Sequence, residues 1–186
     1  MENLGRIHWE AVKRVFRYLL GTKNWKLMYG MTGNGLEGYT DADGSSQEHR
    51  HAISGYAFLI NRGAISKKQE LVTLSTAKSE YIAATYAAKE VLWLRQIIKE
   101  VFQPLEEPIT LYSDSQLEIA LTKDGLYHAQ TKHIDIWYHF ICFKVQKKTI
   151  NLIYCPTEEM TADILTKALP SIKAKHFARV LGLHLT

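Results

Sequence analysis

The hydrophobic and polar positions of this chain follow two periods, one typical of strands and one typical of helices. Residues 36–42, 53–60 and 64–74 are rich in strand-forming side chains and are separated by polar stretches, which predicts three consecutive strands. The link at 61–63 has the length of a hairpin turn, and we expect Gly63 to supply its positive φ. Strands joined by such short links are antiparallel neighbours in a sheet.

Beyond the third strand, helices are expected to alternate with two further strands. Apolar residues recur at i+3 and i+4 from about residue 76 to residue 101, which indicates a long amphipathic helix. The remaining pattern predicts strands at 109–113 and 150–154 and helices at 115–123, 131–145, 157–169 and 172–181. The expected fold is α/β, with a mixed five-stranded sheet of three antiparallel strands followed by helix-linked strands, flanked by helices.

The opening of the chain stands apart from this alternation. A helix is expected at 6–20 and a short strand at 26–29, and the helix carries an apolar stripe suited to packing against something upstream. We therefore divide the chain into a connection or tether segment at 1–35, a main α/β domain at 36–170 and a C-terminal helical tail at 171–186.

Composition and charge narrow the class of protein. The chain has 186 residues, of which 46% are hydrophobic, so a folded core is expected and disorder is not. A net charge of +4 permits a polyanionic partner without requiring one. Two cysteines without metal-binding spacing indicate reduced thiols in an intracellular protein. No secretory signal and no apolar run long enough for a membrane span is expected.

Four acidic residues occupy places where a carboxylate is costly unless a cation lies beside it. Asp41 and Asp114 each end an apolar strand, Glu80 begins the buried stripe of the long helix, and Asp163 lies beside the apolar side of a late helix. The two strands are the natural parallel neighbours at the sheet centre, and the long helix crosses over them. Carboxylates gathered there would repel one another without divalent cations, and oxygen ligands favour Mg²⁺ or Mn²⁺. Two such ions promote phosphodiester cleavage.

A single Asp at the end of a strand is more often a turn residue or a helix cap, and we interpret Asp43 and Glu159 in that way. The hypothesis of a metal site therefore depends on the convergence of the four acids and not on any one of them.

Short stretches around these acids resemble the four acid motifs of the ribonuclease H family. They read YTD at 39–41, SEYIAA at 79–84, LYSDSQ at 111–116 and ADILTK at 162–167. Further stretches are similar to copia-type LTR-retrotransposon polyproteins: SGY at 54–56, KKQ at 67–69, TKHID at 131–135 and YHFI at 138–141. The opening HWEAVKR at 8–14 is similar to the connection that joins reverse transcriptase to ribonuclease H in those polyproteins.

The resemblance implies a ribonuclease H-like domain that cleaves the RNA strand of RNA–DNA hybrids during retrotransposon reverse transcription. It implies two Mg²⁺ ions, with Mn²⁺ as a substitute, held by the catalytic acids Asp41, Glu80, Asp114 and Asp163. The implied partners are an RNA–DNA hybrid and a reverse transcriptase domain of the same polyprotein, with no membrane, in a cytoplasmic retrotransposon particle.

Contacts to the nucleic acid are predicted for a small set of polar and basic residues. Ser45 and Gln116 are assigned by analogy, and the lysines are candidates for phosphate contacts. The full set is Ser45, Gln116, Lys67, Lys68, Lys132 and His133.

An alternative of a different class is a non-catalytic or domesticated ribonuclease H-like domain that binds nucleic acid or serves as a scaffold. Two departures from the family pattern keep it open. The stretch after Asp43 is short, and Lys78 stands where the family typically has Glu.

Overall fold

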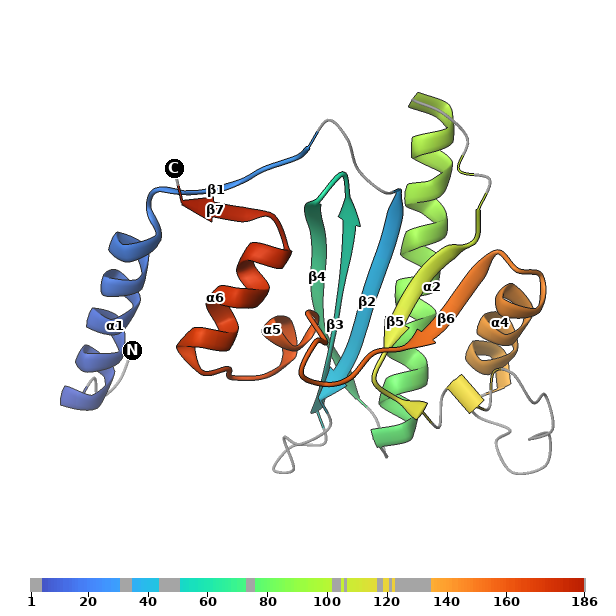
Figure 1. Cartoon of the computed structure of the whole chain (residues 1–186). Coiled ribbons are helices and arrows are strands. Elements are labelled where there is room, and N and C mark those ends of the chain that lie inside the picture. The colour runs from blue at the N-terminus through green and yellow to red at the C-terminus, as the bar shows by residue number, and fades with distance from the viewer. Residues whose placement is uncertain are drawn as a thin grey trace.

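The structure is a computed structural model that describes residues 5–30, 35–43, 51–72, 76–101, 105, 107–116, 119–120, 122 and 135–185 (Figure 1). Its strands are β1 (Trp25–Leu27), β2 (Leu36–Asp43), β3 (His51–Ile60), β4 (Gly63–Val72), β5 (Ile109–Ser113), β6 (Ile150–Tyr154) and β7 (Leu183–Leu185). Its helices are α1 (Arg6–Thr22), α2 (Thr76–Val101), α4 (Asp135–Gln146), α5 (Asp163–Thr166) and α6 (Ser171–Val180).

The main sheet confirms the expected architecture. Its five strands lie in the order β4-β3-β2-β5-β6, with β2 antiparallel to β3 and parallel to β5. The β3–β4 pair is antiparallel, and β6 is parallel to β5. The parallel links are made through helices, because parallel neighbours need a crossover connection. The result places the carboxyl ends of β2 and β5 side by side at the centre of the sheet.

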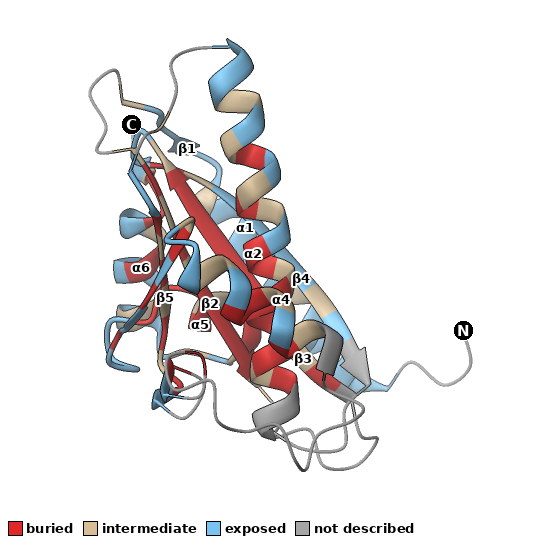
Figure 2. Ribbon diagram, turned by 90° about the vertical axis from the view of Figure 1, so that its right-hand side faces the viewer, coloured by how far each residue is buried: buried red, intermediate tan, exposed pale blue. Residues whose placement is uncertain are grey.

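Helices cover both faces of this sheet. Figure 2 shows the sheet between α6 on one side and α2 and α4 on the other, with buried residues concentrated along the strands and in α2. On the α2 side the largest cluster includes Phe58, Val91, Leu111 and Ile141, all with essentially no exposed surface. A smaller cluster on the α6 side is formed around Leu59 and Leu181. Alternate residues of β3 thus face opposite layers, as the strand period requires.

The β3–β4 turn differs from the prediction that Gly63 takes a positive φ. Ile60 pairs directly with Gly63, and the two residues between them carry the positive φ values, 49° at Asn61 and 68° at Arg62. Positive φ at both central residues is the requirement of a type I′ turn. Glycine at position 63 is explained instead by close packing, because an added Cβ would lie 2.3 Å from Tyr29 Cδ1.

The helix predicted for 157–169 is much shorter in the structure, where only α5 is helical. The residues before it form turns in which the amide of Glu159 donates to the carbonyl of Pro156 and the amide of Asp163 donates to the carbonyl of Met160. Met160 is fully buried within these turns. The acidic pair at 158–159 suited a helix N-terminus, but the segment instead packs as a loop that delivers Asp163 to the sheet.

A short strand after α1 pairs with a short strand near the C-terminal end of the described chain. Strand β7, which the sequence analysis did not predict, is antiparallel to β1. This small sheet is joined to the β3–β4 turn, because Gly30 N donates to Asn61 O at 2.6 Å and Ala64 N donates to Leu181 O at 3.2 Å. Residues 25–30 are therefore attached to the main sheet through β7 and this turn.

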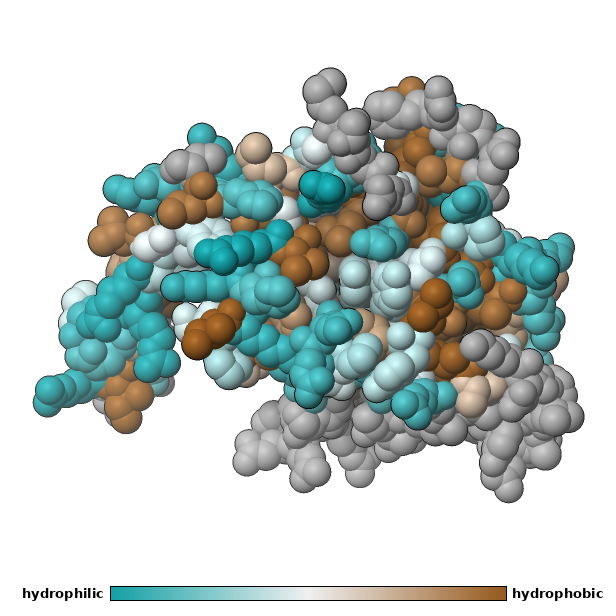
Figure 3. Space-filling view, in the orientation of Figure 1, coloured by the Kyte–Doolittle hydropathy of each residue, from teal (hydrophilic) through white to brown (hydrophobic). Residues whose placement is uncertain are grey.

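Helix α1 extends away from the rest of the chain at the left of Figure 1, and none of its residues is buried. Hydrophobic side chains reach the surface in that region of Figure 3. The hydrophobic residues of α1 that are at least 60% exposed include Ile7, Trp9, Phe16 and Leu20. Among the residues described, no helix combines the length and the apolar character needed to cross a membrane.

Candidate metal centre

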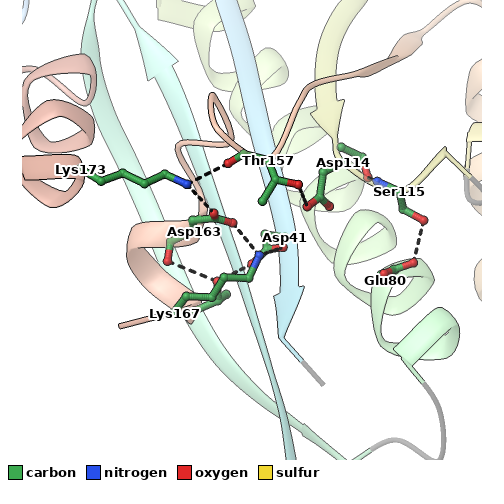
Figure 4. A network of polar contacts seen from close by, with 10 residues as sticks. Asp41, Glu80, Asp114, Ser115, Thr157, Asp163, Lys167 and Lys173 are labelled. Carbon is green, nitrogen blue, oxygen red and sulfur yellow. Dashed lines mark hydrogen bonds and ion pairs between the residues drawn. The ribbon is translucent and has the colours of Figure 1, made fainter. Parts of the chain in front are cut away.

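Parallel pairing brings two of the predicted acids together. Thr40 of β2 is in register with Ser113 of β5, so the next residues, Asp41 near the end of β2 and Asp114 just after β5, lie side by side. The chain returns after β6, and α5 carries Asp163 to the same point (Figure 4). Oxygen atoms of Asp41, Asp114 and Asp163 all lie within 4.8 Å of one another. The topology therefore converges three carboxylates from distant parts of the chain.

Glu80 approaches this cluster from the other side of the sheet. It lies in the first turns of α2, outside the set of three, and its Oε2 accepts a hydrogen bond from Ser115 Oγ at 2.6 Å. With Asp41 and Asp114 it lines a small hollow between β2, β5 and α2. Burial raises the pKa of Glu80, and the negative charges of Asp114 and Asp41 raise it further. The hydrogen bond from Ser115 lowers this pKa but does not cancel the rise. Glu80 is thus electrostatically part of the acidic site.

Asp41 is the most tightly enclosed member on the sheet. Its side chain is 3% exposed, Thr166 Oγ1 donates to Oδ2, and Lys167 Nζ donates to Oδ1 at 3.1 Å. Burial is the largest influence on the pKa of Asp41 and raises it, and the negative charge of Asp163 also raises it. The hydrogen bond from Thr166 and the charge and hydrogen bond of Lys167 lower this pKa, but burial outweighs them. Protons and cations therefore compete for this carboxylate.

Two lysines that the sequence analysis did not assign to the site contact Asp163. Lys167 Nζ lies 2.7 Å from Asp163 Oδ1, and Lys173 Nζ lies 3.4 Å from Oδ2. Burial alone would lower the pKa of Lys167, but hydrogen bonds and charges from Asp163 and Asp41 outweigh it and raise that pKa. The sequence signal that could have identified this ion pair is the spacing of Asp163 and Lys167, which are four residues apart.

The donors available at the site fit a hard divalent cation. The clustered ligand atoms are carboxylate oxygens, the type that Mg²⁺ and Mn²⁺ prefer. Thr40 Oγ1, which lines the same hollow, is buried and has no hydrogen-bond partner among the described residues. Thr157 Oγ1 donates to Asp114 Oδ2 at 3.2 Å, and Asp114 remains partly exposed. Asp41, Glu80, Asp114 and Asp163 are the residues that can hold such an ion, and their role as ligands stays a prediction.

The residues predicted to contact nucleic acid have different positions. Lys68 of β4 pairs with Gly55 of β3, and Gly55 pairs with Asp41 of β2. The three residues form one row across the sheet, so Lys68 lies on the same face as Asp41. Two strand spacings separate them, which is about 10 Å. Lys67 is exposed on the opposite face of β4, and Gln116 is exposed just after Asp114. Ser45, Lys132 and His133 lie outside the described residues.

Comparison with known sequences identifies the relatives of this chain. No protein-family model matches. The Retrovirus-related Pol polyprotein from transposon TNT 1-94 of Nicotiana tabacum is 42% identical over 188 aligned residues, which cover 99% of this chain and 14% of the polyprotein. The chain is a homologue of copia-type, retrovirus-related Pol polyproteins. The Pol polyprotein from transposon RE2 of Arabidopsis thaliana is 31% identical over 95% of the chain and 12% of its own length. The homologous region is therefore a small part of each polyprotein.

Comparison with solved structures establishes the fold. LC11-RNase H1, solved in complex with an RNA/DNA hybrid, matches 70% of this chain and 93% of its own with a TM-score of 0.52 and 16% identity. A second structure of the same enzyme gives a TM-score of 0.56 over 72% of this chain and 94% of its own, also at 16% identity. The copia-type homologue described here therefore has the ribonuclease H fold.

A buried thiol near the acids gives a prediction about reactivity. Cys155 is 5% exposed, and burial, followed by the charges of Glu159, Asp114 and Asp163, raises its pKa from 9.0 to about 11. Because only the thiolate is nucleophilic, a rise of this size lowers the reactive fraction at neutral pH about 100-fold. We expect iodoacetamide to modify the folded chain at Cys155 at least that much more slowly than the urea-unfolded chain. Mass spectrometry of the alkylated peptide over time measures this, and equal rates in the two states would contradict it.

Proposed function

We propose that this chain is a Mg²⁺-dependent endonuclease that cleaves the RNA strand of RNA–DNA hybrids during retrotransposon reverse transcription. The observation that carries the proposal is the convergence of Asp41, Asp114 and Asp163 within 4.8 Å, with Glu80 beside them, at the carboxyl ends of the two central parallel strands. The ribonuclease H fold and the homology to Pol polyproteins support a nuclease that acts on such hybrids. Like charges so close together are favourable only with cations between them.

The side chains have separate tasks in this proposal. Asp41 lies between the other acids, with Asp114 and Glu80 on one side of it and Asp163 on the other. These four carboxylates would hold the metal. Bound Mg²⁺ ions supply an activated water and neutralise charge on the leaving oxygen. Thr166 and Ser115 orient Asp41 and Glu80 by donating hydrogen bonds to them.

Substrate contacts are proposed for the exposed groups around the acids. Lys68 lies in the row of Asp41 and is placed to pair with a phosphate of the strand bound there. Lys67 and Gln116 are exposed and polar, and Gln116 lies two residues after Asp114, so we assign it a contact with a 2′-hydroxyl of the substrate. Shape and 2′-hydroxyl groups, more than base sequence, distinguish a hybrid from DNA. The proposal includes Ser45, Lys132 and His133 as further contacts.

A cleavage assay on three matched substrates tests the function. The purified chain is incubated with an end-labelled RNA–DNA hybrid, or with DNA–DNA or RNA–RNA duplexes of the same sequence, with Mg²⁺ or with EDTA. We expect cleavage of the RNA strand of the hybrid only, and only with Mg²⁺. Binding of the hybrid without cleavage at millimolar Mg²⁺ would instead favour the non-catalytic binding domain.

The exposed helix α1 supports a proposed neighbour in the polyprotein. Its apolar residues, such as Trp9 and Phe16, are more than half exposed, and side chains of this kind are usually covered in a functional assembly. We propose that a reverse transcriptase domain of the same Pol polyprotein packs against them. Co-purification of that domain with this chain, and its loss in Phe16→Asp, would support the contact. Unchanged co-purification of the variant would contradict it.

A further inference from the structure

Positive charge is distributed unequally around the acids of the candidate metal centre. A single ammonium group, Lys167 Nζ, contacts both Asp163 Oδ1 at 2.7 Å and Asp41 Oδ1 at 3.1 Å. A second ammonium, from Lys173, contacts Asp163 Oδ2 at 3.4 Å and also donates to the carbonyl of Thr157 at 3.0 Å. Both oxygens of Asp163 therefore have a lysine partner.

The other half of the site is built differently. Asp114 receives a hydrogen bond from the hydroxyl of Thr157, and Glu80 receives one from the hydroxyl of Ser115. These donors are neutral, so they orient the carboxylates without cancelling their charge. Figure 4 shows the division, with both lysines on the side of Asp163 and Asp41 and the hydroxyl groups of Thr157 and Ser115 on the side of Asp114 and Glu80.

We propose that the Lys167 ammonium and a divalent cation compete for the oxygens of Asp41 and Asp163, so that Lys167 weakens cation binding in this half of the site and withdraws when a cation enters it. The proposal rests on the proposed metal centre and adds a regulator of its affinity. Asp114 and Glu80, which no lysine contacts among the described residues, form the half that accepts a cation without this competition.

Distance and charge explain the competition. A divalent ion such as Mg²⁺ binds oxygen at about 2.0–2.1 Å and needs the lone pairs that the ammonium occupies at 2.7 and 3.1 Å. Two cations on the same carboxylate oxygen also repel each other, most strongly where water is excluded.

The exposure of the side chains identifies which partner moves. Asp41 and Asp163 are 3% and 1% exposed and are held in place, whereas the Lys167 side chain is 30% exposed. A lysine head group on a flexible four-carbon stem can turn toward solvent at little cost. Lys167 is therefore the group that can leave when a cation binds.

Binding of Mn²⁺ to the chain without nucleic acid tests the proposal. Titration followed by electron paramagnetic resonance measures the dissociation constant independently of cleavage. We expect Lys167→Met to tighten binding about tenfold, which corresponds to about 1.4 kcal/mol. Lys167→Arg, which keeps the charge, should remain close to the unsubstituted chain. Lys175→Met on α6 is the matched control, because Lys175 is exposed and its loss changes the net charge equally.

Thermal unfolding supplies a second readout. In EDTA, Lys167→Met should unfold at a lower temperature than the unsubstituted chain, because two buried carboxylates lose their cation. Added Mn²⁺ should then raise the midpoint by more than it does in the unsubstituted chain. Lys173 contacts Asp163 but no other acid of the site, so Lys173→Met should also tighten binding, although less. This variant tests the proposal if Lys167→Met does not fold.

The outcomes separate this proposal from the proposed function. Binding in Lys167→Met that is no tighter than in Lys175→Met overturns the competition, and weaker binding shows that Lys167 instead holds the acids in place for the ion. Absence of Mn²⁺ binding in the unsubstituted chain and in every lysine variant would overturn the metal centre itself, and with it the proposed function.

Discussion

Replacing Asp114 by Asn is expected to reduce Mg²⁺-dependent cleavage of an RNA–DNA hybrid by more than about 100-fold, the upper range for losing a residue that only supports a metal ligand. The substitution removes one negative charge from three carboxylates that lie within 4.8 Å of one another. The fold should survive, because Asp114 is partly exposed and the amide oxygen of Asn can still accept the hydrogen bond from Thr157. Cleavage rates on an end-labelled hybrid and the circular dichroism spectrum of the variant measure the two effects.

The control for this substitution lies just before the same strand. Glu107 precedes β5 and is exposed, so Glu107→Gln removes a negative charge of similar kind far from the acidic cluster. We expect the control to cleave at the unsubstituted rate. A variant Asp114→Asn that cleaved as fast as Glu107→Gln would show that this carboxylate does not hold the catalytic ion, even if the chain were a nuclease.

Replacing Gly55 by Val is expected to displace α5 and to damage both stability and cation binding. A Cβ at position 55 would lie 2.8 Å from Leu165 Cβ and 3.0 Å from Thr166 Cγ2. These atoms are close to the backbone of α5, so rotation of a side chain cannot relieve the contact. Overpacking of this kind costs about 1–3 kcal/mol. Asp163 begins α5 and Thr166 donates to Asp41, so displacement of the helix separates the acids and weakens Mn²⁺ binding.

Denaturant unfolding and Mn²⁺ titration of the same protein sample measure these two losses. Gly21→Val is the matched control, because no heavy atom lies within 4 Å of a Cβ built at position 21. We expect that variant to keep the cation affinity of the unsubstituted chain. If Gly55→Val lowered stability without changing that affinity, the position of α5 would not control the metal centre.

The main sheet was largely predictable because its information is local. Runs of strand-forming side chains marked each strand of the five-stranded sheet, and the lengths of the connections indicated which pairs are antiparallel and which are parallel. From that order alone, Asp41 and Asp114 were expected to leave neighbouring strands, and the structure places them side by side. The buried stripe of α2 likewise followed from helical spacing, and it brings Glu80 beside them.

The errors arose where a residue's role depends on a distant partner. Gly63 was assigned to the turn for its backbone freedom, yet its distinctive contact is with the ring of Tyr29, which packs on it. The helix expected before Asp163 carried acidic residues suited to a helix start, but the segment forms turns around the buried side chain of Met160. Strand β7 escaped prediction because three residues give no period of their own and need β1 as a partner.

The order of the elements and the identity of the acids follow from local patterns, since strand and helix periods and apolar runs that end in a carboxylate are properties of neighbouring residues. The cations and hydroxyl groups that surround those acids depend on long-range packing. Lys167 is 126 positions from Asp41, and Thr166 is 125 positions from it, so no local pattern encodes their contacts. Burial explains why these contacts form, because a carboxylate removed from water needs hydrogen-bond donors from the protein. The packing of α5 supplies those donors.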